Sequence, residues 1–299
     1  MLLPGTFLKG RYRVKRQIGE GGEGEIFVAR DERLGRDVAV KLQLPRAFES
    51  SGTYACYGKS IEAEHERLES VADVPGIPRV IDKGSFGRNG SKFLVMELVD
   101  GVTIGSWIKA HEPVPTAAVV SVVAQLCDIL DVLHTTKGYV HCDITAKNTM
   151  LRHDGRVRLL DVGISVVKGT LNKTPAGSPE YAAPEQGDTA AVLTPQVDVF
   201  ALGALLFEMA VSQLPYYALE RPLDGSARPF PDGFGRWLPG PLRELGLAMV
   251  SLDAGERPDG VAEVARRLRP LLPAPGSPAP AKMTRPDPTA PYRLGYSVT

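Results

Sequence analysis

The strongest constraint on this chain is a short run, HCDITAKN from His141 to Asn148, followed by DVG from Asp161 to Gly163. Asp143 and Asn148 lie five positions apart, and Asp161 comes thirteen positions after Asn148. ATP-dependent phosphoryl transfer uses such a set. One Asp orients the acceptor hydroxyl and takes its proton, while the Asn and the later Asp hold Mg²⁺ against the phosphates. Asp and Asn are also common turn residues, so this interpretation depends on the rest of the chain.

A glycine-rich segment, IGEGGEGEI from Ile18 to Ile26, lies near the start of the sequence. Apolar residues lead into it and out of it, which indicates that the glycines join two strands; a dinucleotide fold would run from a strand into a helix. A plain hairpin turn is the alternative. Roughly a dozen residues later, VAVK from Val38 to Lys41 is typical of a short strand that ends in one Lys.

Together these motifs resemble the signature set of the protein kinase family. The resemblance covers about residues 11–270 and implies an α+β fold with a β-rich N-lobe that contains one helix (11–98) and a mainly helical C-lobe (102–270). It implies ATP and Mg²⁺ as cofactors, with Mn²⁺ as an alternative metal. Asp143 would be the catalytic base, Asn148 and Asp161 the metal ligands, and Lys41 the cation on the α- and β-phosphates.

The resemblance also implies which residues line the nucleotide site. Backbone N–H groups of the glycine segment would approach the phosphates, Met96 would be the gatekeeper, and the backbones of Glu97 and Val99 would contact adenine. The full set is Ile18, Gly19, Glu20, Gly21, Gly22, Glu23, Gly24, Ile26, Ala39, Lys41, Met96, Glu97, Val99 and Met150.

The sequence from residue 61 to 68 predicts a helix that would supply the acidic partner of Lys41. We choose Glu64, because apolar residues then follow on its inward face at i+4 and i+7. Glu62 and Glu66 are the alternatives. Residues 45–60, which precede the helix, are predicted to form a mobile loop.

Further motifs follow in the order of the family. GSPEYAAPE from Gly177 to Glu185 resembles the segment that shapes the peptide-binding groove. Asp198 would brace the catalytic loop from the start of a buried helix, and Arg257 would pair with Glu185. A long amphipathic helix is predicted over residues 116–136.

Several positions depart from the family pattern. Cys142 stands where many kinases have the Arg that binds a phosphorylated activation loop, so the chain resembles a non-RD kinase. Thr145 replaces the Lys that normally neutralises the transferring phosphoryl; Lys147 would take over this role or else point to solvent. Val162 replaces the Phe of the DFG motif. Glutamates turned inward would repel ATP, so three side chains are expected to face water: Glu20, Glu23 and Glu25.

Thr174 and Thr170 lie where many kinases carry an activating phosphothreonine. A phosphate there usually acts through charge-assisted bonds to the Arg beside the catalytic Asp, and Cys142 can make none. We therefore expect a kinase that is active without phosphorylation of this loop.

Composition narrows the function classes. The net charge is zero, which gives no electrostatic footprint for nucleic acid. Three cysteines without a pattern suit a reducing compartment, and no signal-peptide core or membrane span is expected, so the predicted location is the cytoplasm. Residues 271–299 contain seven prolines and are predicted to be a disordered or PPII-like tail, either a docking segment or an inert one.

The function predicted from these features is that of a bacterial serine/threonine protein kinase with a protein substrate, which receives its signal through a partner protein. The alternatives are a catalytically impaired pseudokinase that acts as a scaffold, and a small-molecule kinase of related fold.

Overall fold

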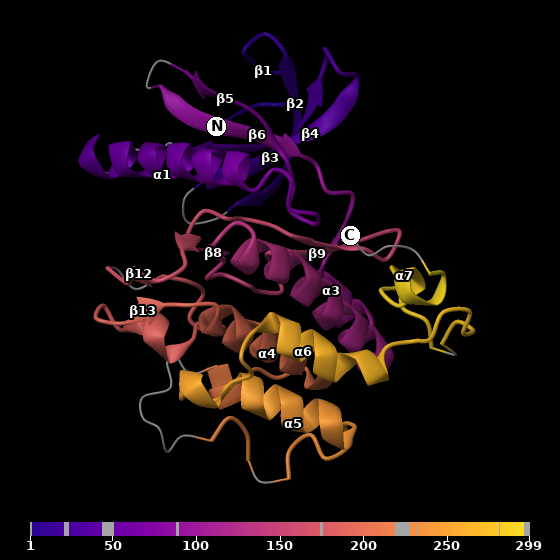
Figure 1. Ribbon diagram of the computed structural model, residues 1–299. Helices are drawn as coiled ribbons and strands as arrows, with labels where there is room; N and C mark the ends of the chain where they lie inside the picture. Colours follow the sequence, from indigo (N-terminus) through magenta and orange to yellow (C-terminus); the bar gives the residue numbers. More distant parts are fainter. Residues whose placement is uncertain are drawn as a thin grey trace. The chain divides into compact units, whose positions relative to one another are not determined.

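The computed structural model describes residues 2–20, 24–43, 51–87, 90–173, 176–218, 228–231, 233–280 and 282–295. The chain divides into two compact units (Figure 1). Unit 1 comprises Met1–Asp73 and Pro78–Val99, and unit 2 comprises Val74–Ile77 and Asp100–Thr299.

The described residues of unit 1 form a six-stranded antiparallel sheet and one helix, and the strand order is β1-β2-β3-β4-β6-β5. Its elements are β1 (Phe7–Leu8), β2 (Tyr12–Glu20), β3 (Gly24–Asp31), β4 (Arg36–Gln43), α1 (Ser51–Ser70), β5 (Val80–Phe86) and β6 (Ser91–Glu97). Successive strand side chains point to opposite faces, so alternate residues gather on one face. Phe27 with Ala29, and Val38 with Val40, build the core there. Helix α1 packs against β4, β5 and β6.

The glycine segment joins β2 to β3, as the sequence predicts, and Glu20 pairs with Glu25 across the two strands. Residues 21–23, including Glu23, lie outside the described residues. A Cβ on Gly24 would lie 2.5 Å from the carbonyl oxygen of Leu42, so only glycine allows β3 and β4 to pair this closely.

One expectation about this segment is wrong. Glu20 is exposed, but Glu25 is buried, with 7% of its surface accessible. Strand β3 lies inside the sheet between β2 and β4, and most of its side chains are buried. The sequence pattern of the glycine segment does not reveal this coverage.

The prediction of a mobile loop over residues 45–60 is also wrong for its second half, because α1 begins at Ser51. Residues 45–50 lie outside the described residues. No proline interrupts the stretch between Ser51 and Ile61, and a glycine inside a helix costs only about 1 kcal/mol, so Gly52 and Gly58 do not end the helix.

Unit 2, where the structure describes it, is mainly helical and contains three small antiparallel sheets, β10-β9-β7, β11-β8 and β12-β13. Its first elements are β7 (Gly101–Thr103), α2 (Ile104–Ala110), α3 (Thr116–Thr135), β8 (Tyr139–Val140), β9 (Thr149–Arg152), β10 (Val157–Leu159), β11 (Val166–Val167), β12 (Thr170–Leu171) and η1 (Pro184–Gly187). The later ones are β13 (Val192–Leu193), α4 (Gln196–Val211), η2 (Pro215–Ala218), α5 (Gly240–Met249), η3 (Ala254–Glu256), α6 (Val261–Leu268), η4 (Arg269–Leu271) and α7 (Ala290–Arg293).

Helix α3 confirms the long helix predicted over residues 116–136 and forms the centre of unit 2, where it packs against α4 and α6. Among the described helices it alone has the length and apolar composition to cross a membrane, and 72% of that stretch is buried inside the unit. Burial of this extent is what a core helix shows.

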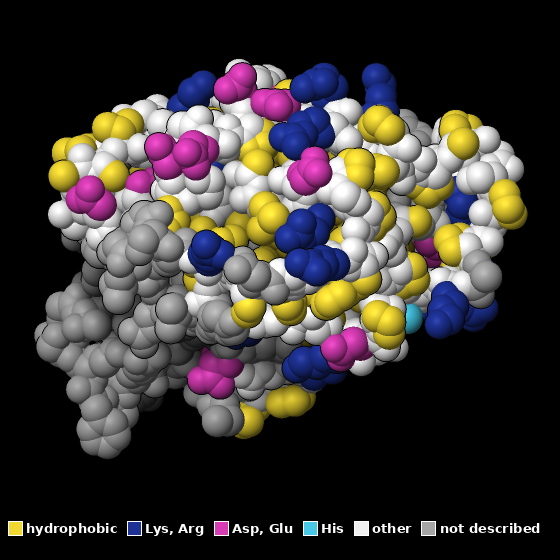
Figure 2. All heavy atoms as spheres, turned by 90° about the horizontal axis from the view of Figure 1, so that it is seen from below, with side chains coloured by type: hydrophobic (Ala, Val, Ile, Leu, Met, Phe, Trp, Pro, Cys, Tyr) yellow, Lys and Arg dark blue, Asp and Glu magenta, His cyan; other side chains and the backbone are white. Residues whose placement is uncertain are grey.

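Charged side chains on the face drawn in Figure 2 are of both signs and are interspersed among apolar and neutral ones. This mixture agrees with the zero net charge of the sequence.

The predicted disorder of the proline-rich tail is wrong for residues 282–295. They include helix α7, and Thr284 and Thr289 are almost completely buried. Proline removes a backbone donor but keeps its carbonyl acceptor. The carbonyls of Pro286 and Pro288 accept hydrogen bonds from Trp107 and Gln125, so tertiary contacts order the segment.

Candidate active site

The catalytic loop from His141 to Asn148 is held by one buried carboxylate. Asp198, near the start of α4, accepts the backbone N–H groups of His141 at 2.7 Å and of Cys142 at 2.8 Å. It also bonds the ring of His134 at 2.8 Å. Asp198 is fully buried, and the predicted brace is confirmed.

Electrostatics favour the charged form of this brace. Burial alone would raise the pKa of Asp198, but the hydrogen bond and charge of His134 and the N–H groups of the loop hold that pKa below its usual value. The two ring nitrogens of His141 have different partners. Nδ1 accepts a hydrogen bond from the N–H of Asp143, and Nε2 lies 3.1 Å from the carbonyl of Leu160. Because Nδ1 accepts, Nε2 is the ring nitrogen placed to donate to the Leu160 carbonyl.

Asp143, the predicted base, is half-buried and held by two hydrogen bonds to its carboxylate. Asn148 Nδ2 donates to Oδ2 at 2.6 Å, and the backbone N–H of Ser178 donates to Oδ1 at 2.9 Å. The first bond links the base to a predicted metal ligand, and the second links it to the GSPEY segment. The structure thus brings three parts of the predicted site together.

The two predicted metal ligands lie at the open end of one hairpin, formed by β9 and β10. Asn148 precedes β9, Asp161 follows β10, and the N–H of Leu160 donates to the carbonyl of Asn148 at 2.7 Å. Asp161 is exposed, has a positive φ of 59°, and accepts the N–H of Gly163 at 2.9 Å. The β9–β10 hairpin therefore fixes the backbone positions of Asn148 and Asp161 relative to each other.

The donor set fits Mg²⁺ bound together with phosphates. Within the described residues, no group of three or more His, Cys, Asp or Glu side chains could hold a metal. Mg²⁺ is usually bound by one or two carboxylates together with water and substrate phosphates, not by a cage made of protein alone. Oxygen ligands from Asn148 and Asp161 match that preference.

The unusual side chains of the loop have distinct environments. Thr145 is buried, and its Oγ1 accepts the N–H of Asn148 at 3.1 Å. Lys147 is exposed and makes no hydrogen bond or ion pair with the part of the chain that the structure describes. Burial and the nearby Asp198 raise the pKa of the Cys142 thiol, so it stays protonated and does not act as a nucleophile. Val162 is buried.

In unit 1, Lys41 and Glu64 form a buried ion pair with Nζ and Oε2 2.6 Å apart. This contact confirms the choice of Glu64 over Glu62 and Glu66. Their side chains are only 9% and 2% exposed, so the pair joins β4 firmly to α1.

The other residues predicted to bind the nucleotide occupy varied positions within their own units. Ala39 is buried, Ile18 and Glu20 are exposed, and the remaining described members are half-buried except for the buried Gly24. The backbone N–H of Glu97 is already bonded to the carbonyl of Arg79 at 2.8 Å. Met150 lies on β9 in unit 2.

The activation segment, residues 161–186, carries two buried amides that sequence reasoning missed. Gln186 donates to the carbonyls of Cys142 at 2.8 Å and Ala176 at 3.2 Å, and its Oε1 accepts the N–H of Ala183. Asn172 donates to the carbonyls of Gln186 and Asp188 at 3.0 and 2.9 Å. Gln186 directly follows the APE triplet, but only the fold shows that its amide reaches the catalytic loop.

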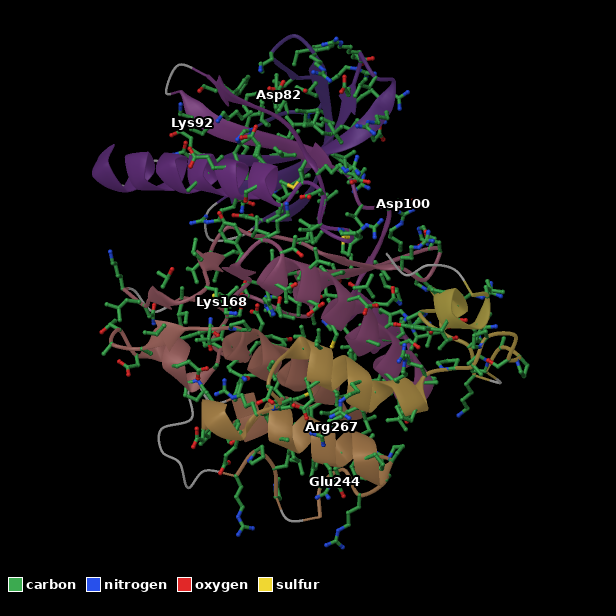
Figure 3. All side chains as sticks on the ribbon, viewed as in Figure 1. Asp82, Lys92, Asp100, Lys168, Glu244 and Arg267 are labelled. Carbon is green, nitrogen blue, oxygen red and sulfur yellow. The ribbon has the colours of Figure 1, made fainter. Side chains whose placement is uncertain are left out.

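Candidate phosphorylation sites lie on the same segment. Thr170 is half-buried, and its Oγ1 donates to the carbonyl of Val167 at 2.6 Å. Thr174 lies outside the described residues. Lys168, labelled in Figure 3, is exposed between β11 and β12.

The end of the segment is fixed by the predicted pair of Glu185 and Arg257, which is confirmed. Two parallel bonds of 2.6 and 3.0 Å join the guanidinium to the carboxylate. Arg257 is buried, bonds the carbonyl of Gln196, and lies over the ring of Phe200 at 5.0 Å. A bidentate pair of this kind is geometrically specific.

Comparison with known proteins agrees with this architecture. Residues 12–226 match the family model described as protein kinase domain. The chain is 33% identical to probable serine/threonine-protein kinase pknA2 of Bifidobacterium longum, over 71% of this chain and 28% of that protein. It is 32% identical to serine/threonine-protein kinase PknA of Mycobacterium tuberculosis, over 93% of this chain and 67% of that protein.

The chain therefore belongs to the protein kinase family, and the predicted family and two-lobed fold class are confirmed. A further relative, probable serine/threonine-protein kinase PknB of Lactococcus lactis, is 30% identical over 72% of this chain. The chain spans only 28% and 34% of the lengths of the Bifidobacterium and Lactococcus proteins.

Replacing Asp198 by Asn should destabilise the protein by roughly 3 kcal/mol at neutral pH, because a buried carboxylate that accepts several hydrogen bonds is lost. The folded-state pKa of Asp198 is depressed, so its contribution is present above the unfolded value of about 4 and is lost as pH falls through the folded pKa. Urea unfolding from pH 8 down to pH 3 should show the gap between wild type and variant closing at the acidic end. The exposed control Asp188→Asn should change stability by less than about 0.5 kcal/mol. A gap that widens on acidification would contradict the assignment.

Proposed function

We propose that this chain is an ATP-dependent kinase that transfers the γ-phosphate to serine or threonine hydroxyls of protein substrates. The observation that carries the proposal is the double restraint on Asp143, by Asn148 at 2.6 Å and by the N–H of Ser178 at 2.9 Å. A general base must be fixed within hydrogen-bonding reach of the proton that it takes. One carboxylate linked both to a metal ligand and to the peptide-platform segment meets that need.

Within this proposal the residues have separate roles. Asp143 orients the acceptor hydroxyl and takes its proton. Asn148 and Asp161 hold Mg²⁺, with Mn²⁺ as an alternative, and the bound cation would neutralise charge on the phosphates. Lys41, positioned by Glu64, contacts the α- and β-phosphates. Backbone groups of the glycine segment and of Glu97 and Val99 bind the rest of ATP, beside Met96 and Met150.

Specificity for serine and threonine is supported by the names of the relatives and by the GSPEYAAPE platform, which tyrosine kinases replace by a different sequence. We place the kinase domain in the cytoplasm and expect its signal to come from a partner protein. A catalytically impaired scaffold is the competing function, supported by the side chains of Cys142, Thr145 and Val162.

Substitution of Asp143, the proposed base, distinguishes an active kinase from a catalytically impaired scaffold. Asp143→Asn should lower turnover by roughly 10²–10⁴ with little change in ATP affinity. Asp161→Ala should abolish Mg²⁺-dependent nucleotide binding, because the metal would bridge the phosphates through that carboxylate. Labelled ATP with a generic protein substrate measures the first effect, phosphoamino-acid analysis identifies the acceptor, and calorimetric titration of Mg²⁺·ATP measures the second. Equal labelling by wild type and Asp143→Asn would favour the scaffold.

Substitution of Lys147 tests whether this side chain takes over the role of the Lys that Thr145 replaces. If its ammonium stabilises the transferring phosphoryl, Lys147→Ala should lower kcat by roughly 10²–10³ and leave the KM for ATP nearly unchanged. Lys168→Ala is the matched control, since it removes an exposed lysine from the same unit. A Lys147→Ala enzyme within about twofold of wild type would place this side chain in solvent.

Control of the site follows from how the activation segment is tied. Cys142 lacks the charge that would capture a phosphate, but its backbone carbonyl accepts a bond from Gln186. Gly177 lies beside this contact with φ of 97°, and a Cβ there would lie 2.9 Å from the same carbonyl. Neutral amides and close backbone packing therefore replace the ionic tie of other kinases in this proposal.

We expect phosphatase treatment, Thr170→Ala and Thr174→Ala each to leave the rate on an exogenous substrate within about twofold of wild type. Gln186→Leu, which keeps the size of the side chain but removes its bonds, should lower that rate by about tenfold or more, because one buried amide contributes several bonds at once. The measurement is initial-rate kinetics on one peptide. A tenfold loss on dephosphorylation would show that another cation binds the phosphate.

A further inference from the structure

Residues 282–295, which we call the C-terminal strap, lie on a surface of unit 2 formed by α2, α3 and the β9–β10 turn. In Figure 1 the strap's helix α7 lies beside α3. Trp107 on α2 donates its ring N–H to the carbonyl of Pro286 at 3.1 Å, and Gln125 on α3 donates to that of Pro288 at 3.3 Å. The N–H of Arg285 donates to His111 Nε2 at 3.1 Å. Two of these three bonds are accepted by backbone carbonyls of the proline-containing strap, and the third is donated by its backbone N–H.

The receiving surface fits this segment closely. Gly155, in the β9–β10 turn, has φ of 82°, and a Cβ there would lie only 2.2 Å from the carbonyl oxygen of Asp287 and 3.1 Å from Pro291. Both the backbone conformation and the approach of the strap therefore require glycine. Trp107 and Gln125 are 1% and 2% exposed, so their polar atoms are removed from water and need these partners.

The strap also holds its own shape. Asp287 and Arg293 form an ion pair at 2.6 Å with both side chains 11% exposed, and Thr289 Oγ1 donates to Asp287 at 2.7 Å. The N–H of Gly276 donates to the carbonyl of Arg293 at 2.7 Å. A segment that is ordered in its bound shape loses less entropy when it binds.

We propose that the surface of Trp107, His111, Gln125 and Gly155 is a peptide-binding groove for a proline-containing segment, that the strap is its occupant, and that occupancy fixes the hairpin of the metal ligands. Gln125 connects the strap to the β9–β10 hairpin. Its Nε2 bonds the carbonyls of Pro288 and Gly155, and its Oε1 accepts the N–H of Val157 on β10.

The catalytic consequence rests on the proposed function. The strap and Gln125 hold the closed end of the β9–β10 hairpin, and Asn148 and Asp161 lie at its open end. Loss of the strap would remove the bonds of Trp107 and Gln125 to Pro286 and Pro288 and the packing of Asp287 on Gly155, which leaves Gln125 to hold the turn through Gly155 and Val157 and loosens it. Displacement of the two predicted metal ligands would then weaken Mg²⁺ binding more than it weakens binding of the acceptor peptide.

A truncated chain that ends after Pro280 tests the groove against a control chain that ends after Gly295. Hydrogen exchange of residues 149–159 should be at least about tenfold faster in the chain without the strap, and a synthetic peptide of residues 282–295 should bind it and restore protection. The same peptide with Asp287→Ala should bind at least about tenfold more weakly. Fluorescence anisotropy of labelled peptide measures binding and needs no kinase activity.

Enzyme kinetics tests separately whether loss of the strap weakens Mg²⁺ binding. The truncated chain should show a KM for Mg²⁺ raised by about fivefold or more, with the KM for the acceptor peptide within about twofold, and the added peptide should reverse the change. Unchanged exchange of residues 149–159 or failure of the peptide to bind would overturn the groove. Changed exchange with no kinase activity in either chain would leave the groove standing and remove the proposed function.

If the truncated chain does not fold, Trp107→Phe in the full chain replaces it, since Phe keeps the ring but loses the bond to Pro286. Faster exchange across residues 149–159 and 282–295 together is then expected. Exchange that rises in the strap alone would overturn its link to the hairpin.

Discussion

The carboxylate of Asp198 is the constraint on which the candidate site depends. It accepts two consecutive backbone N–H groups, from His141 and Cys142, and lies against His134 in a fully buried position. A buried charge with so many donors fixes the backbone of the loop more strictly than apolar packing would, because displacement would leave the charge unsatisfied. The positive φ of 69° at Cys142, which few non-glycine residues adopt, is held by these bonds. The positions of Asp143 and Asn148 follow from that turn.

This dependence on backbone atoms explains why the chain departs from its family where it does. Cys142 contributes its N–H to Asp198 and its carbonyl to Gln186, so the identity of its side chain is nearly irrelevant to both bonds. Thr145 goes further, since its hydroxyl accepts the N–H of Asn148, and a lysine, which has no acceptor, could not do so. The substitution that removes a cation therefore adds a restraint on Asn148, a predicted metal ligand. Val162, in place of the Phe of the DFG motif, is apolar and buried.

The sequence was sufficient for the parts of the molecule that charge and spacing determine. Lys41 with Glu64 and Arg257 with Glu185 pair as predicted, because a buried charge has few acceptable partners and the motif spacing left few candidates. The sequence was insufficient where hydrogen bonds between neutral groups, or contacts between distant segments, determine the structure. Glu25 is buried on an inner strand of the sheet, and α1 extends to Ser51 through residues of weak helix propensity. Neither the reach of the Gln186 amide nor the contacts of residues 282–295 have a local sequence signal.

The order of residues 282–295 shows why a composition rich in proline does not settle whether a segment folds. Proline excludes helix interiors and sheet ladders because it lacks a donor, and the prediction of disorder assumed that no other source of order exists. A carbonyl needs only a donor from elsewhere, and here Trp107 and Gln125 supply donors from α2 and α3. Those donors are themselves buried, and the ring N–H of Trp107 donates to the strap while Gln125 joins the strap to the carbonyl of Gly155. The strap is therefore ordered in the same way as the catalytic loop on Asp198, by buried polar groups that bond backbone atoms far away in the sequence.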